Sequence, residues 1–533
     1  MNLPSLIPEM ILVAVAAAIF LGGAFWDVRR LWGWTAWAAL ASAALALGFG
    51  PAPGLVRWLA VGFGALLVPL AARAASAESL GALLVSIAGW MLVARAADLA
   101  TLFIGLELVS IPTYVLLALG RHDAEGREST AKYFFLSVLS SAVLLYGFSF
   151  FYGVTGSLEL RAVQTAVPTG FAAFDRLAAG LIFAGLCFKI TAVPFQFYAP
   201  DVYEGNTYPN AAMLSVVPKA AGLAAMVKLL AIALPCPGAF VWQMVLAVAI
   251  LSMTLGNALA LWQDNLRRML AYSSIAQSGY LLIGLATAMG GVASGHWDGI
   301  AAMWFYFVTY AAATTGAMAA LEHLGRSDRR LDGIEELAGL GRTRPAVAAV
   351  LAVCLLGLTG VPPLAGFWGK LLLFGGALNV GGSARLWFIA LAVVGALNAA
   401  VGAAYYLRVV AVMYFRTPLA TPRAEGGRGA LWIAVGCALL TIAIGVWPGP
   451  WRVGCGTWRA ENQEAAPMSR LEDRTPQDSP QTKKTATPVC PEPWRGGARQ
   501  CSFWLGDAII EDASDNIVSP RCEFVTKLRK NLQ

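Results

Sequence analysis

Charged residues are scarce in this chain. Only 13% of its 533 residues are Asp, Glu, Lys or Arg, whereas 58% are hydrophobic. Soluble globular domains carry about 25% charged residues, so this deficit excludes an ordinary soluble domain. The formal net charge of +7 does not indicate nucleic-acid binding, because the basic residues lie in short loops, as orientation signals do. The composition predicts an all-α polytopic membrane protein.

Metal-ligating residues are also sparse. The three histidines are isolated from one another, and four of the eight cysteines lie near the C-terminus at spacings that match no metal motif. The other four cysteines lie in or beside apolar segments, where we interpret them as small core residues. The sequence contains no phosphate-binding glycine motif. We therefore expect neither a metal site nor cofactor chemistry in this chain.

Long apolar runs fill most of the sequence. About fourteen runs of roughly twenty residues are separated by charges and Pro/Gly clusters, and this length crosses a bilayer as a helix. The predicted spans lie near residues 6–26, 31–50, 55–72, 79–94, 99–120, 130–152, 176–199, 210–233, 240–262, 269–289, 299–321, 345–376, 386–413 and 430–449. The first run lacks a preceding basic stretch, so we expect a span rather than a cleavable signal.

Basic residues in alternate loops predict the orientation. One set of loops holds sixteen: Arg29, Arg30, Arg73, Arg121, Arg127, Lys132, Arg267, Arg268, Arg326, Arg329, Arg330, Arg342, Arg344, Arg416, Arg423 and Arg428. The other set holds five: Arg57, Arg95, Arg161, Arg176 and Arg385. This asymmetry predicts that the first set is cytoplasmic and the N-terminus periplasmic. An even number of spans also places the polar, Pro-rich segment 451–533 outside, where we expect disorder.

A few ionisable residues lie inside the apolar runs. Glu107 occurs in "LFIGLELVSIPTYVLLALG", and Lys189, Lys219 and Lys370 each occur in a separate run. Charges at membrane depth are costly and often mark ion pathways. One acid and three lysines together favour a function, although a fixed Glu–Lys ion pair that sets helix register is the structural alternative. For Lys228 we favour a structural interpretation, in which its ammonium extends to the membrane surface.

Proline residues lie close to two of these lysines. Pro194 follows Lys189, and Pro362 and Pro363 precede Lys370. Proline breaks a membrane helix and frees backbone carbonyls. Two broken helices at corresponding places are typical of transporters with inverted repeats, whereas an ordinary proline kink is the simpler explanation. The lysine precedes one break and follows the other, an order that suits two halves of opposite topology.

Proton transfer is the chemistry that these residues suggest. A carboxylate within about 4–6 Å favours a protonated lysine, and its withdrawal lets the proton leave. Lys219 and Lys370 can then pass the proton along the membrane midplane. Side chains able to hold connecting waters are Ser137, Ser140, Ser141, Ser273, Ser274, Gln277 and Tyr310, although we expect most to form ordinary interhelical hydrogen bonds. We expect Asp201 and Glu204 to cap helix ends rather than to gather protons.

Six segments together carry a family resemblance. They are "GLELVSIPTYVLLAL", "AKYFFLSVLSSAVLLYG", "FKITAVPFQFYAPDVYEG", "NLRRMLAYSSIAQSGYLLIGL", "GVPPLAGFWGKLLLF" and "YYLRVV". Over roughly residues 1–450 the chain resembles the antiporter-like membrane subunits of respiratory complex I, NADH-quinone oxidoreductase. The resemblance implies that Glu107 is the fifth-helix glutamate and Lys189 the seventh-helix lysine. It likewise implies that Lys219 bridges the two halves, that Lys370 lies near the outward path, and that Lys132 can contact the relay.

The resemblance also implies an architecture and a setting. It implies fourteen transmembrane helices, with N-terminal helices in 1–95, inverted five-helix repeats in 79–233 and 240–413, and a last helix in 430–450. It implies that NADH, FMN, iron–sulfur clusters and quinone bind other subunits. The implied surroundings are antiporter-like neighbours, small membrane subunits and the lipid bilayer of the bacterial inner membrane.

Two other functions remain open at this point. A subunit of a multisubunit cation/proton antiporter would need the same buried charges without redox chemistry. A non-pumping structural subunit would hold Glu107 and Lys189 in a permanent bridge.

Overall fold

The structure is a computed structural model in which nearly all described residues are helical. It describes residues 3–26, 28–50, 54–71, 76–160, 172–233, 239–290, 298–325, 332–418 and 427–449. The segment 451–533, for which we expect disorder, lies outside these ranges. Within them, the strand-type pairing consists of two isolated bridges, Asp98–Glu159 and Asn265–Gly333. The predicted all-α class is therefore confirmed for the described part of the chain.

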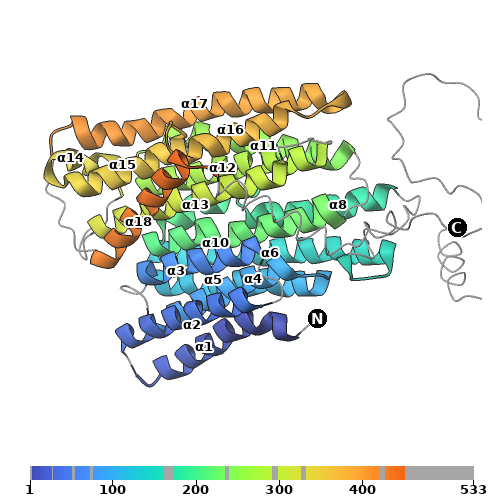
Figure 1. Ribbon diagram of the computed structural model, residues 1–533, viewed down its shortest axis with the longest axis horizontal. Helices are drawn as coiled ribbons and strands as arrows, with labels where there is room; N and C mark the ends of the chain where they lie inside the picture. The colour runs from blue at the N-terminus through green and yellow to red at the C-terminus, as the bar shows by residue number, and fades with distance from the viewer. Residues whose placement is uncertain are drawn as a thin grey trace, which may run out of the picture. The chain divides into compact units, whose positions relative to one another are not determined.

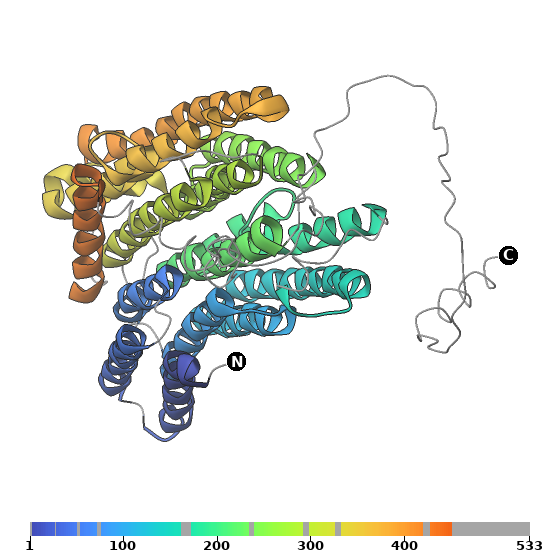
Figure 2. The ribbon, with the colours of Figure 1, turned by 45° about the vertical axis from the view of Figure 1, so that its right-hand side comes forward.

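A helix or a pair of helices occupies each predicted apolar range (Figures 1 and 2). The helices are α1 (Ile7–Gly23), α2 (Arg29–Phe49), α3 (Leu55–Ala71), α4 (Ala77–Arg95), α5 (Leu99–Gly120), α6 (Ala124–Thr155), α8 (Ala172–Lys189), α9 (Ala199–Glu204), α10 (Tyr208–Met226), α11 (Ala239–Leu261), α12 (Leu266–Gly290), α13 (Gly299–Leu324), α14 (Leu340–Thr343), α15 (Pro345–Thr359), α16 (Ala365–Leu378), α17 (Arg385–Phe415) and α18 (Arg428–Val446). A π-helical segment, Val227–Ala233, extends α10. Among the described residues, nine helices are long and apolar enough to cross a membrane, and α1, α3, α15 and α16 are shorter apolar helices.

Polar side chains define where several of these helices begin. Asp98 accepts a hydrogen bond from the Thr101 amide at 2.7 Å at the start of α5. Asp123 accepts one from the Gly126 amide at 2.9 Å at the start of α6. Such caps satisfy amide groups that have no partner within the first helical turn. They fix the first residues of these two helices.

The helix that carries Lys189 is broken after that residue, and Pro194 lies in the break between α8 and α9. The Val193 amide donates to Ser252 Oγ at 3.0 Å, and Ser278 Oγ donates to the Ile190 carbonyl at 2.5 Å. Neighbouring helices therefore satisfy backbone groups that the break frees, as an apolar environment requires.

The second break lies between α15 and α16 and contains Pro362 and Pro363. Gly360 ends α15 in a left-handed conformation, with φ of 88°, which favours glycine. The two helical parts also approach closely, because a Cβ atom on Gly366 would lie 1.9 Å from the Gly357 carbonyl oxygen. Both predicted helix breaks are thus confirmed, and the second depends on glycine at two positions.

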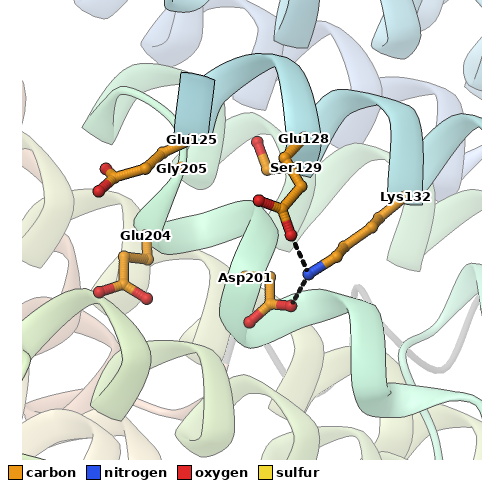
Figure 3. A pocket seen from close by; sticks show the side chains of 7 residues that line it. All are labelled: Glu125, Glu128, Ser129, Lys132, Asp201, Glu204 and Gly205. Atoms are coloured by element: carbon orange, nitrogen blue, oxygen red, sulfur yellow. Dashed lines mark hydrogen bonds and ion pairs between the residues drawn. The ribbon is translucent and has the colours of Figure 1, made fainter. Parts of the chain in front are cut away.

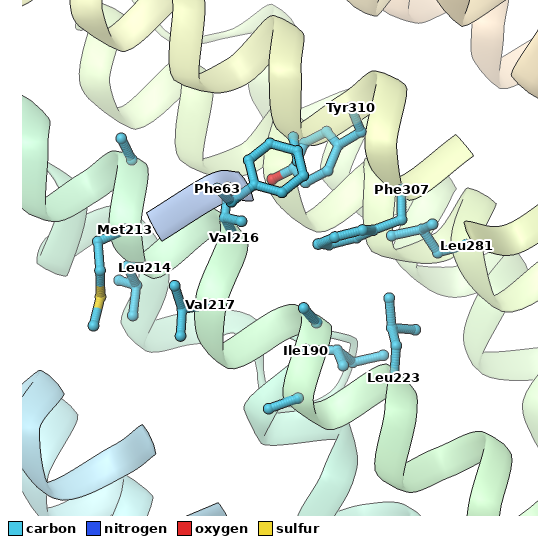
Figure 4. Packing of buried hydrophobic residues seen from close by; sticks show 14 of the residues in the cluster. Phe63, Ile190, Met213, Leu214, Val216, Val217, Leu223, Leu281, Phe307 and Tyr310 are labelled. Atoms are coloured by element: carbon cyan, nitrogen blue, oxygen red, sulfur yellow. The ribbon is translucent and has the colours of Figure 1, made fainter. Parts of the chain in front are cut away.

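The most enclosed helices lie at the centre of this bundle. All residues in an 18-residue stretch of Tyr208–Ala231 are buried, whereas 33% of the residues in an 18-residue stretch of Gly382–Phe415 are buried. Helix α10 contacts α3, α4, α5 and α8 on one side and α13 on the other. Figure 4 shows Val216, Val217 and Leu223 of α10 packed among side chains of neighbouring helices. A charged residue on α10 is therefore surrounded by protein.

Candidate functional site

Glu107 and Lys189 lie together between α5 and α8. Lys189 Nζ is 3.6 Å from Glu107 Oε1. The Lys189 side chain is 2% exposed, whereas the Glu107 side chain is 22% exposed. The separation is within the range over which a carboxylate favours a protonated lysine, so the two residues are placed for a charge interaction.

Three serine hydroxyls complete the surroundings of the Lys189 ammonium. Lys189 Nζ donates to Ser110 Oγ at 2.6 Å, Ser141 Oγ at 3.2 Å and Ser137 Oγ at 3.4 Å. Ser141 Oγ also donates to Glu107 Oε1 at 2.5 Å. Ser141 therefore bridges Glu107 and Lys189, and the Lys189 ammonium has neutral partners besides the Glu107 carboxylate.

Lys219 lies on α10 and is fully buried. Its Nζ donates to the Ser274 carbonyl at 2.7 Å, to Ser274 Oγ at 2.8 Å and to the Tyr310 hydroxyl at 3.3 Å. It also lies 4.9 Å from the centre of the Tyr310 ring. All of these partners are neutral, so the environment of Lys219 differs from that of Lys189.

Lys370 lies on α16 and reaches back across the second break. Its Nζ donates to the carbonyls of Leu358 at 3.1 Å and Thr359 at 2.8 Å, which are the last residues of α15. It also lies 5.0 Å from the centre of the Tyr280 ring. The carbonyl end of a helix carries partial negative charge, so the break itself provides the counter-charge for this lysine.

Further buried polar side chains contact one another near Ser274, the residue that binds Lys219. Ser273 and Gln277 lie on α12, the helix that also carries Ser274. Ser273 and Tyr406 share a hydrogen bond, Gln277 Nε2 donates to the Tyr406 hydroxyl at 3.3 Å, and the Tyr306 hydroxyl donates to Gln277 Oε1. These contacts bring α12, α13 and α17 together around buried hydroxyl and amide groups.

The polar groups continue from Tyr406 towards Lys370. The Tyr405 hydroxyl donates to Asn257 Oδ1 at 3.0 Å, and Asn257 Nδ2 donates to the Tyr280 hydroxyl at 3.4 Å. We call the set Ser273, Gln277, Tyr306, Tyr406, Tyr405, Asn257 and Tyr280 the hydroxyl–amide chain. Only Ser273 and Gln277 of this set were predicted from the sequence, although a lone Asn and a Tyr pair inside apolar runs are themselves signals of interhelical hydrogen bonding.

Seven polar residues were predicted to be able to hold connecting waters. Among the described residues, Ser140 is the one of these seven that makes only an ordinary structural contact. Its Oγ donates to the Gly185 carbonyl of α8 at 2.8 Å. This hydrogen bond joins α6 to α8 and touches neither member of the Glu107–Lys189 pair. We expected most of the seven to form only such ordinary contacts, but the other six contact Lys189, Lys219 or the hydroxyl–amide chain.

Lys228 lies buried beside the end of a neighbouring helix. The residue is 7% exposed, and its Nζ donates to the Ala96 carbonyl at 2.8 Å. Ala96 is the C-cap residue of α4, where carbonyls lack partners within the helix and the helix dipole favours a cation. This local attraction holds the ammonium inside the protein. Lys228 shares no hydrogen-bond partner with Lys189, Lys219 or Lys370.

Lys132 lies outside the buried charges. It is 43% exposed and forms ion pairs with Glu128 Oε1 at 2.8 Å and Asp201 Oδ2 at 2.7 Å (Figure 3). These residues line a pocket of about 200 Å³, whose other lining residues are Glu125, Ser129, Glu204 and Gly205. The structure therefore does not bring Lys132 into contact with Glu107 or Lys189.

Asp201 and Glu204 bind a cation from the other half of the chain. Arg268 Nη1 donates to Asp201 Oδ1 at 3.0 Å and to Glu204 Oε2 at 2.7 Å. Asp201 lies in the first turn of α9, where a carboxylate is favoured, but Glu204 is the last residue of that helix. The C-terminus of its own helix disfavours the charge of Glu204, which Arg268 compensates, and Glu204 Oε1 also accepts a hydrogen bond from Asn265 Nδ2 at 2.9 Å at the start of α12. No group of three or more possible metal ligands occurs among the residues that the structure describes.

Comparison with known proteins identifies the family. The model of the NADH:quinone oxidoreductase/Mrp antiporter transmembrane family matches residues 96–397. NADH-quinone oxidoreductase subunit N of Granulibacter bethesdensis is 39% identical over 371 residues, which cover 69% of this chain and 75% of that protein.

Solved structures share the fold. A chain of respiratory complex I from Thermus thermophilus with bound aureothin is 31% identical, with a TM-score of 0.70 over 83% of this chain and 97% of that chain. A chain of the Mrp complex from Dietzia sp. DQ12-45-1b has a TM-score of 0.73 over 88% of this chain and 99% of that chain, but at 20% identity it shows the fold alone. The chain therefore belongs to the NADH:quinone oxidoreductase/Mrp antiporter family of membrane subunits, within the group of NADH-quinone oxidoreductase subunit N.

Proposed function

We propose that this chain is a proton-translocating membrane subunit of NADH-quinone oxidoreductase, and that Glu107, Lys189, Lys219 and Lys370 form its relay. The observation that carries the proposal is the Glu107–Lys189 pair, in which an almost completely enclosed ammonium lies 3.6 Å from a carboxylate and contacts three hydroxyls. Such a lysine can gain and lose a proton when its carboxylate moves.

The first step is control of the proton on Lys189. Glu107 favours the ammonium while the two groups remain close, and movement of the carboxylate favours release. The serines at positions 110, 137 and 141 hold the Lys189 nitrogen during that movement. Glu107 is the more exposed partner, so we assign the movement to the acid rather than to the lysine.

The second step is transfer through the centre of the subunit. Lys219 has neutral acceptors, so its charged form is not compensated by a contacting carboxylate and is costly to maintain. This environment suits a residue that holds a proton briefly. The hydroxyl–amide chain offers donors and acceptors from the surroundings of Lys219 towards Tyr280, beside Lys370.

The architecture that we propose contains fourteen membrane spans and two inverted repeats. The repeats occupy 79–233 and 240–413, preceded by N-terminal helices in 1–95 and followed by a last helix in 430–450. One broken helix in each repeat supports this division. The count of basic loop residues supports a periplasmic N-terminus in the bacterial inner membrane.

The redox chemistry belongs to other subunits in this proposal. NADH, FMN, iron–sulfur clusters and quinone bind elsewhere in the complex, and this chain contributes the membrane path. Its partners are the antiporter-like neighbours and small membrane subunits of the same complex. The name of the Granulibacter relative and the complex that contains the Thermus chain support this assignment.

The cation/proton antiporter is the second function to test. The family model covers both classes, and the Dietzia chain shows that the fold serves an Mrp complex. The relatives at 36–43% identity are named as subunits of NADH-quinone oxidoreductase, which favours the redox-driven function. Co-purification with redox subunits distinguishes the two.

The decisive experiment measures NADH-driven proton pumping by complexes that carry Glu107→Gln, Lys189→Ala or Lys219→Ala. We expect each variant to assemble and to lose most of its pumping. The replacement Arg385→Gln, at an exposed residue, is the matched control and should pump normally. Normal pumping by an assembled Glu107→Gln complex would refute the relay and favour a structural role for the ion pair.

A further inference from the structure

A second group of buried charges lies at one end of α1, α3 and α4, away from the proposed relay. Glu9 Oε2 accepts a hydrogen bond from Arg57 Nη2 at 2.9 Å, and the side chains are 7% and 6% exposed. Arg57 Nη2 also donates to the Ser5 carbonyl at 3.0 Å, and Arg95 Nη2 donates to Ser5 Oγ at 2.6 Å. We call Glu9, Arg57, Arg95 and Lys228 the N-terminal charge cluster.

Shared partners and neighbouring positions group these residues. Arg57 and Arg95 both donate to Ser5. Lys228 is anchored nearby on the Ala96 carbonyl, next to Arg95 in the chain. The cluster thus contains three cations and one carboxylate, which gives it an excess of two positive charges.

Among the described residues, neither Arg95 nor Lys228 has a carboxylate as a hydrogen-bond or ion-pair partner. Asp98 is close in sequence, but its carboxylate accepts hydrogen bonds from the amide and hydroxyl of Thr101 at 2.7 Å each. Within the described ranges, Arg95 Nη1 is buried and has no hydrogen-bond partner. Arg95 as a whole remains partly exposed, so a ligand can approach it from outside. Buried cations without a counter-charge are costly, and a guanidinium fork binds phosphate through parallel hydrogen bonds.

The position of the cluster indicates the source of the anion. Arg95 is the last residue of α4, while Glu9 and Arg57 lie in the first turns of α1 and α3. Ends of membrane helices lie at the level of the lipid headgroups, where a guanidinium can pair with the phosphate of an anionic headgroup. We propose that the N-terminal charge cluster binds the phosphate group of an anionic phospholipid, with Arg95 as the contacting residue.

Retained lipid is the direct test. The full-length protein is purified with its accompanying membrane subunits, washed in detergent under identical conditions and assayed for bound phospholipid by native mass spectrometry. Relative to wild type, Arg95→Gln should lose a tightly retained anionic phospholipid, and Arg95→Lys should retain it more weakly because it keeps the charge without the fork. Arg385→Gln removes an exposed cation from the same predicted set of loops and should retain lipid as wild type does.

Adding ligands back identifies the source of the phosphate. Phosphatidylglycerol should raise the thermal midpoint of the washed wild-type and Arg385→Gln proteins but not that of Arg95→Gln. An equal, Arg95-dependent rise with inorganic phosphate alone would support the phosphate site but assign it to free phosphate. If Arg95→Gln and Arg95→Lys both retain lipid and respond to phosphatidylglycerol as wild type does, the proposal is overturned. Neither readout depends on proton pumping, so the relay can fail without affecting this result.

Discussion

The two helix breaks each hold a buried lysine, but they compensate its charge differently. Lys189, at the first break, faces a carboxylate on another helix at 3.6 Å. Lys370, at the second break, binds the carbonyls of Leu358 and Thr359 at the end of its own broken helix. A carboxylate is a full charge on a side chain that can move, whereas helix-end carbonyls are partial charges fixed in the backbone.

This difference separates a switched site from a static one. At the first break, motion of Glu107 changes the electrostatic environment of Lys189 without unfolding the backbone. At the second break, the environment of Lys370 changes only if α15 and α16 move relative to each other or if the charge on a neighbouring group changes. The following predictions test this distinction, in order of decreasing effect.

The largest effect is expected from Lys189→Met. The change removes the proton carrier and leaves Glu107 without its cation. We therefore expect the pumping rate to fall by roughly tenfold or more, because a free-energy change of about 1.4 kcal/mol already corresponds to a factor of ten. Loss of one partner from a buried ion pair is also destabilising, so the thermal midpoint of the complex should fall. The double variant Glu107→Gln/Lys189→Met should recover the thermal midpoint without recovering pumping. An unchanged thermal midpoint in Lys189→Met alone would contradict the charge pairing.

Lys370→Met should lower pumping by no more than Lys189→Met does, with a smaller loss of stability. No carboxylate contacts Lys370 in the described residues, so the replacement leaves two carbonyl groups without a donor rather than an unpaired charge; such unmet groups cost about 1–3 kcal/mol each. Thermal melting of the two single lysine variants, side by side, provides the comparison. A midpoint for Lys370→Met that lies below that of Lys189→Met would show that the second site is not the static one.

Tyr406→Phe tests the path between the two sites. The change removes the hydroxyl that Ser273 and Gln277 contact while preserving the ring, and a lost buried hydrogen bond costs about 0.5–1.5 kcal/mol. We expect slower pumping by an assembled complex. Tyr414→Phe, on the same helix but partly exposed, is the control, and equal pumping by the two variants would remove Tyr406 from the path.

The smallest effect is expected from Ser110→Ala. Lys189 loses its shortest hydrogen bond, at 2.6 Å, but keeps Ser137, Ser141 and Glu107. We expect a loss of about 1 kcal/mol in stability and a modest decrease in pumping, both measured on the purified complex. A loss as large as that of Lys189→Met would mean that Ser110, rather than Glu107, governs the site.

Much of the fold follows from composition and local pattern. Apolar runs of membrane length predict where helices lie, because every backbone polar group must be satisfied within a helix when water is absent. Pro194, Pro362 and Pro363 predict both breaks, because proline cannot donate a hydrogen bond within a helix. The same reasoning identifies Glu107 and the three lysines, since a charge in an apolar run stands out without any knowledge of its neighbours.

Contacts between distant segments could not be predicted in the same way. The hydroxyl–amide chain joins Asn257, Gln277 and Tyr406 from three different helices, and single polar residues in apolar runs do not reveal which of them meet. The partner of Lys228 could not be predicted either, because the Ala96 carbonyl is a backbone group with no signature in the sequence.

The sequence by itself determined the membrane class, the helices, the breaks and the identity of the charges at membrane depth. Only the tertiary structure decided that Lys189 faces a carboxylate while Lys219 and Lys370 face neutral oxygen atoms. The physical reason is that the cost of burying a charge depends on its location along one helix, whereas its compensation depends on which other helices pack around it.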